Sequence, residues 1–140
     1  MSKEFLVFAI AVSVSLVLHL LIVFSIYHPG NALSMPLTAG MVFSWLYTSS
    51  TIKDLYYNQK EFEFKTFLNA IPFLLKYLLL FLAIYSVINF ANSFSSQYDD
   101  SWIDFDLDYQ KLRGISAFWI FFYMVGLTTS YLKAILNKQS

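Results

Sequence analysis

Residues 5–27 read FLVFAIAVSVSLVLHLLIVFSIY, an apolar run interrupted only by small hydroxyl residues and one histidine. A helix rises about 1.5 Å per residue, so about 20 residues cross a hydrocarbon core of about 30 Å. The run is too long for the apolar core of a secretory signal, which has about 7–15 residues, and no small-x-small cleavage site follows it. We therefore expect a retained membrane anchor here.

Three further apolar stretches follow, at residues 36–52, 74–94 and 115–136. The first of these is short and ends in the polar sequence TSST at residues 48–51. Hydrophobic residues make up 58% of the 140 residues and charged residues 13%, which is too apolar for a soluble domain of this size. The sequence predicts an all-α integral membrane four-helix bundle, with residues 1–140 forming a single transmembrane domain.

The distribution of positive charge favours four spans over three. With four spans and a cytoplasmic N-terminus, most of the cationic residues face the cytoplasm, and only Lys111 and Arg113 face outward. The inner set comprises Lys3, Lys53, Lys60, Lys65, Lys76, Lys133 and Lys138. Three spans with the same cytoplasmic start would reverse this bias, against the positive-inside rule. We expect a multi-pass protein of a bacterial-type cytoplasmic membrane, with both termini in the cytoplasm.

Two loops follow from this topology, an inner loop at residues 53–73 and an outer loop at residues 95–113. The inner loop becomes apolar before Pro72, through Phe62, Phe64, Phe67, Leu68 and Ile71. Proline ends or kinks a helix. This segment is therefore either an interfacial segment on the inner leaflet or the early start of a tilted third span.

Small residues recur at helical spacing in two of the spans. Gly126, Ser130 and Ala134 form a stripe in the last span, and Gly40 begins a similar stripe in the second. In lipid, helices associate through such close packing and through interhelical hydrogen bonds. The stripes serve either packing within one chain or contacts between copies of it.

Polar or amphipathic residues in each expected span fall at one depth, counted inward from the outer ends. His19 lies about 12 Å below Tyr27 by the helical rise. The other members of this layer are Ser44, Trp45, Tyr85, Ser86 and Tyr123. A buried neutral imidazole must satisfy both ring nitrogens. His19 is therefore either a crosslink between helices or part of a proton or small-ligand path.

The outer loop carries the most distinctive polar sequence. Its candidate partner-binding residues are Asp99, Asp100, Trp102, Asp104, Phe105, Asp106, Asp108 and Tyr109. Strict alternation over residues 103–110 is typical of an extended strand, with the aspartates on one face. The loop is a solvated face resting on the membrane, an edge that pairs with another chain, or a cation site. An EF-hand fails, because Tyr109 and Ile115 occupy the positions of the required glycine and glutamate.

Composition excludes several classes of function. The net charge is zero, so no electrostatic basis for nucleic-acid binding exists, and the absence of cysteine excludes disulfides and thiolate catalysis. No metal motif, phosphate loop or catalytic constellation occurs, so we expect a non-enzyme with no metal or cofactor. The leading hypothesis is a protein-binding accessory or immunity-type subunit, acting on a membrane or envelope protein through the outer loop. The alternative is a homo-oligomeric cation channel or membrane-permeabilising effector.

Overall fold

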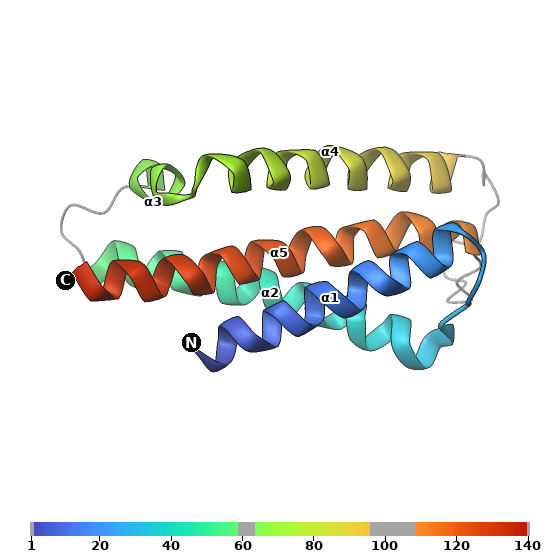
Figure 1. The fold of residues 1–140 in the computed structure, drawn as a ribbon, viewed down its shortest axis with the longest axis horizontal. Coiled ribbons are helices and arrows are strands. Elements are labelled where there is room, and N and C mark those ends of the chain that lie inside the picture. Colours follow the sequence, from blue (N-terminus) through green and yellow to red (C-terminus); the bar gives the residue numbers. More distant parts are fainter. Residues whose placement is uncertain (1, 59–63, 96–108, 140) are drawn as a thin grey trace.

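The computed structural model describes residues 2–58, 64–95 and 109–139, and the regular structure in these ranges is entirely helical. The helices are α1 (Lys3–Val23), α2 (Gly30–Asn58), α3 (Phe64–Ala70), α4 (Phe73–Ser95) and α5 (Tyr109–Gln139). α1, α2 and α4 each pack against α5, which runs through the middle of the molecule (Figure 1). The start of α1 and the end of α5 lie at the same end of the helix array.

Buried polar side chains lie inside this array beside apolar ones, and large apolar side chains cover its outside. The buried polar residues are Ser15, His19, Ser34, Ser44, Thr48, Thr51, Ser86, Ser93, Ser116, Thr128, Thr129 and Ser130. Large apolar side chains, such as Phe43, Leu74 and Phe81, are 61–81% exposed. A soluble protein would expose such residues only singly, whereas lipid accepts a continuous apolar surface.

Three helices among the described residues are long and apolar enough to cross a membrane: Lys3–Val23, Phe73–Ser93 and Lys111–Lys138. They correspond to the first, third and fourth expected spans. Together with the apolar exterior, their length indicates a membrane protein.

α2 is not apolar enough along its length to be counted with these three helices. It also differs in extent from the expected span at residues 36–52. It begins at Gly30 and continues through Asn58, with Pro36 inside the helix. Proline lacks the amide hydrogen for the bond to the preceding turn, yet membrane helices tolerate it where neighbouring helices hold them. α5 supplies that support along α2.

The turn between α1 and α2 is short and well defined. α1 ends at Val23, and the amides of Ser25 and Ile26 donate to the carbonyl oxygens of Ile22 and Leu21, at 3.0 and 2.8 Å. Gly30 opens α2 with a φ of 64°, a conformation that costs glycine little because it has no side chain. Residues 24–27, expected to finish the first span, therefore belong to this turn.

Much of the expected inner loop at residues 53–73 is helical. α2 extends into it, and α3 forms a separate short helix that ends before Pro72. Phe67 and Ile71 are buried in one cluster with Leu55 and Leu132. These contacts hold α3 against the end of the array, so the third long helix starts at Phe73, after the proline.

The outer loop is also shorter than the expected residues 95–113. α4 includes Ser95 and α5 begins at Tyr109. The prediction of an extended strand is therefore wrong for Tyr109 and Gln110, which start α5. The physical reason is tertiary packing, because Leu112 in the next turn is fully buried. Residues 103–108 lie outside the described residues.

Candidate functional site

His19 is the centre of a hydrogen-bonded cluster that joins three helices. Its Nδ1 lies 2.7 Å from the Ser116 hydroxyl of α5, and its Nε2 lies 2.8 Å from the Tyr85 hydroxyl of α4. The Ser116 hydroxyl is also 3.3 Å from the carbonyl oxygen of Arg113. A neutral ring with its proton on Nδ1 satisfies all three bonds: Nδ1 donates to Ser116, Ser116 donates to Arg113, and Tyr85 donates to Nε2.

The other residues of the predicted polar layer do not form one layer. Ser86 donates to the carbonyl oxygens of Leu82 and Ala117, at 2.6 and 3.0 Å, close to the His19 cluster. Ser44 donates to the carbonyl oxygen of Phe122, and Tyr123 donates to that of Leu37, so this pair joins α2 to α5 instead. Trp45, the remaining predicted member, is 56% exposed, and its ring contacts the Phe122 ring edge-on.

Several interhelical hydrogen bonds join residues that the sequence did not predict to be partners. Trp119 donates its indole N–H to the hydroxyl of Thr38 at 3.1 Å, and Thr48 pairs with Thr129 at 3.2 Å. Arg113 donates to the Ser25 hydroxyl at 2.6 Å, beside the carboxyl end of α1. Each bond pairs residues more than 80 positions apart, which no local pattern reveals.

Hydrogen bonds within the chain satisfy nearly all of the buried polar side chains. Among the described residues, the Ser15 hydroxyl is the one buried side-chain polar atom without a partner. Buried polar groups in lipid-facing proteins are costly unless paired. Through these bonds His19 and Ser44 link one helix to another. Ser34 and Thr128 instead donate to carbonyl oxygens of their own helices.

The small residues of α2 and α5 mostly serve packing inside the chain. A Cβ at Gly40 would overlap the Tyr123 hydroxyl, and one at Gly126 would lie 2.6 Å from the Ser44 hydroxyl and against the Phe8 ring. Ser130 is buried and donates to the carbonyl oxygen of Leu127. The last residue of the predicted stripe, Ala134, is exposed.

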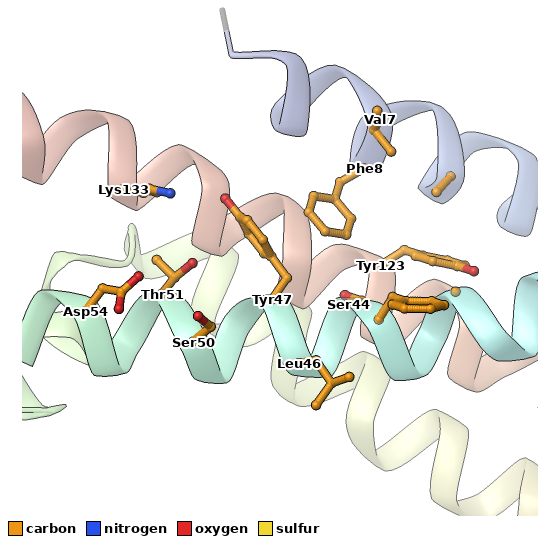
Figure 2. Close-up of a pocket in the computed structure, with 13 residues that line it drawn as sticks. Val7, Phe8, Ser44, Leu46, Tyr47, Ser50, Thr51, Asp54, Tyr123 and Lys133 are labelled. Atoms are coloured by element: carbon orange, nitrogen blue, oxygen red, sulfur yellow. The ribbon is translucent and has the colours of Figure 1, made fainter.

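A groove of about 690 Å³ opens between α1 and α2, which both pack on α5 and meet within the groove, where the centres of the Phe8 and Tyr47 rings lie 5.1 Å apart (Figure 2). Its apolar part is lined by side chains of α1 and α2, including Val7, Phe8 and Leu46. Gly40 and Tyr123 line one end of the groove. Ser44 and Tyr123 of the predicted layer line the groove. The sequence did not indicate the groove itself, because it depends on the separation of two helices.

The other end of the groove is polar and carries opposite charges. Asp54 and Thr51 of α2 lie there with Lys133 of α5 (Figure 2). The Lys133 ammonium lies 5.8 Å from the centre of the Tyr47 ring, and its charge attracts the carboxylate of Glu4. This end can receive a polar group that bears both charges.

The predicted partner-binding residues of the outer loop lie outside the described residues, except Tyr109, whose backbone starts α5. Within the described ranges, no three histidine, aspartate or glutamate residues gather as a metal site. The chain matches no protein-family model, no curated protein and no solved structure.

Proposed function

We propose that this chain is a small, non-enzymatic protein with four membrane spans, in a bacterial-type cytoplasmic membrane. Both termini are cytoplasmic, and the acidic-aromatic outer loop binds another membrane or envelope protein. An accessory subunit, or an immunity-type subunit that protects against an envelope-acting toxin, has these properties. The observation that carries the proposal is the polar interior of the helix array, because its groups are paired within the chain.

The arrangement of α2 supports a fourth span. Its 29 residues correspond to about 43 Å, close to the full thickness of a bilayer with its headgroups. Its hydroxyl residues Ser44 and Thr48 are buried and bonded to α5, whereas Val42, Phe43 and Leu46 are 55–70% exposed. Low apolarity in this helix thus reflects the face turned inward, and the face turned outward suits lipid.

The same interior favours partner binding over conduction. An ion path needs polar groups that are free to replace water around the ion. His19, Tyr85 and Ser116 bond to one another, and Ser44 and Tyr123 bond to backbone carbonyl oxygens. The densest group of carboxylates in the sequence belongs to the outer loop, which contains Asp99, Asp100, Asp104, Asp106 and Asp108.

Partner capture tests the role of the loop. The affinity-tagged chain is extracted from its own membranes in mild detergent and weighed by native mass spectrometry. We expect a second polypeptide in fixed ratio, and we expect the triple variant Asp104→Asn, Asp106→Asn, Asp108→Asn to lose most of it. The matched control, Glu61→Gln with Glu63→Gln, removes carboxylates from the inner loop and should retain the partner. Capture unchanged by the triple variant contradicts the proposal.

Labelling of single cysteines tests the four spans, and the natural chain contains none to interfere. In intact cells, a membrane-impermeant maleimide should label Asp100→Cys, and it should label neither Ser2→Cys nor Lys138→Cys until the membrane is broken. Three spans would place residues 2 and 138 on opposite sides of the membrane, so one of these two positions would be labelled in intact cells. That pattern would overturn the topology.

A further inference from the structure

We propose that the groove between α1 and α2 binds one phospholipid of the inner leaflet with a phosphoethanolamine headgroup. Its acyl chain lies along the apolar part of the groove, and its headgroup lies between Lys133 and Asp54. The inference rests on the proposed membrane location and inward-facing termini, and it is independent of the outer loop.

The apolar part of the groove suits a hydrocarbon chain. Val7 and Phe8 line it from α1, and Phe43 and Leu46 line it from α2. Val7, Phe43 and Leu46 are 55–70% exposed in the isolated chain, so burial under an acyl chain would remove apolar surface. Lipid is the medium around this face, and the groove is open to it between the two helices (Figure 2).

The length of the groove matches one leaflet. Gly40 and Asp54 line its two ends on α2, and fourteen residues of helix separate them, or about 21 Å. Half of a hydrocarbon core of about 30 Å is about 15 Å, and one headgroup layer adds about 6 Å. A lipid whose tail reaches Gly40 therefore has its headgroup beside Asp54.

The charges at the polar end select the headgroup. The Lys133 ammonium can bind a phosphate, and the Tyr47 ring lies next to it. Asp54 lines the same end, and the carboxylate of Glu4 is attracted to Lys133. A purely anionic headgroup can bind Lys133 but brings no cation of its own to these carboxylates, whereas a primary ammonium can donate hydrogen bonds to Asp54.

The polar end also lies at the right level of the helix array. Lys133 and Asp54 belong to the last turns of α5 and α2, at the end where α1 begins. Under the proposed topology this end faces the cytoplasm. The occupant is therefore a lipid of the inner leaflet.

Native mass spectrometry of the delipidated full chain tests the proposal. Phosphatidylethanolamine, phosphatidylcholine and phosphatidylglycerol with identical acyl chains are added separately. We expect one molecule of phosphatidylethanolamine to be retained about tenfold more tightly than the other two, the factor expected for one hydrogen bond to a charged group. Phosphatidylcholine is the critical control, because its quaternary ammonium has no N–H to donate.

Two variants assign the headgroup contacts. Asp54→Asn should reduce the affinity for phosphatidylethanolamine to that for phosphatidylcholine, and Lys133→Met should weaken all three lipids about tenfold. The matched control is Lys53→Met, which removes a charge at the same end from a side chain that does not line the groove. Asp54 is exposed, so its variant tests the site even if Lys133→Met fails to fold.

Three results would overturn the proposal. One is equal retention of phosphatidylethanolamine and phosphatidylcholine by the natural chain. Another is preference for phosphatidylglycerol, and the third is a preference for phosphatidylethanolamine that survives Asp54→Asn. None of these outcomes depends on the partner-capture experiment, because the loop aspartates are unchanged in every variant used here.

Discussion

α5 and α4 each contain an apolar stretch of 18 residues within a helix long enough to cross a membrane, yet the surroundings of the two stretches are opposite. In α5, 56% of this stretch is buried in the protein, against 11% in α4. α5 carries Gly114, Ser116 and Gly126 where other helices approach it closely, whereas α4 exposes Leu74, Phe81 and other large apolar side chains. The more buried helix is the less apolar one, because lipid, not water, is the medium that α4 meets. In such a protein, the helix positions that are buried are those with small and hydroxyl-bearing residues.

The largest effect should come from filling the closest contact of α5. Gly126→Leu would drive a side chain into the Phe8 ring and the Ser44 hydroxyl. We expect a loss of about 3 kcal/mol in the free energy of unfolding in micelles, the upper range for overpacking. Ala91→Leu on the exposed side of α4 is the matched control and should change it by less than about 0.5 kcal/mol. Equal losses of unfolding free energy in the two variants would contradict the contrast drawn between α5 and α4.

An intermediate effect should come from the crosslink that ties α4 and α1 to α5. His19→Leu removes the bonds to Ser116 and Tyr85 and leaves the Tyr85 hydroxyl without its partner. Interhelical bonds in lipid average about 0.6 kcal/mol each, so we expect a loss of about 1–2 kcal/mol in unfolding free energy. Ser13→Ala is the control, because its hydroxyl bonds only to Ala9 of its own helix. An unchanged stability of His19→Leu would show that this cluster does not hold α4 in place.

The smallest effect should come from one neutral bond between α2 and α5. Thr48→Val keeps the shape of the side chain and removes its hydrogen bond to Thr129. The expected loss is about 0.6 kcal/mol in the same unfolding measurement. Ser49→Ala, on the exposed side of α2, should have no measurable effect. A loss above about 2 kcal/mol would mean that this bond belongs to a larger network than the pair.

Hydropathy and helical spacing were sufficient to predict the helical class and three long apolar helices. They also placed His19 and Tyr85 in one polar layer, because both residues lie within apolar segments. Ser116 was missed for a geometric reason. Depth was counted from Tyr27, but α1 ends at Val23, so His19 lies only about 6 Å from the end of its helix.

The groove could not be predicted from the sequence. Its polar end combines Lys133 with Asp54, which are far apart in the chain, and it exists because α1 and α2 diverge on α5. Periodicity reports which face of a helix is polar, and it carries no information on the spacing between two helices. Trp45 shows the same limit, since its depth was right for the polar layer but its side chain faces outward.

The central position of α5 also has a consequence for biosynthesis. α1, α2 and α4 emerge from the ribosome before the helix on which all three pack. Until α5 enters the membrane, His19, Ser44 and Ser86 lack their partners in that helix. The nascent chain therefore stays an unassembled set of helices in lipid, open to membrane proteases and chaperones, and its tertiary structure forms in one late step.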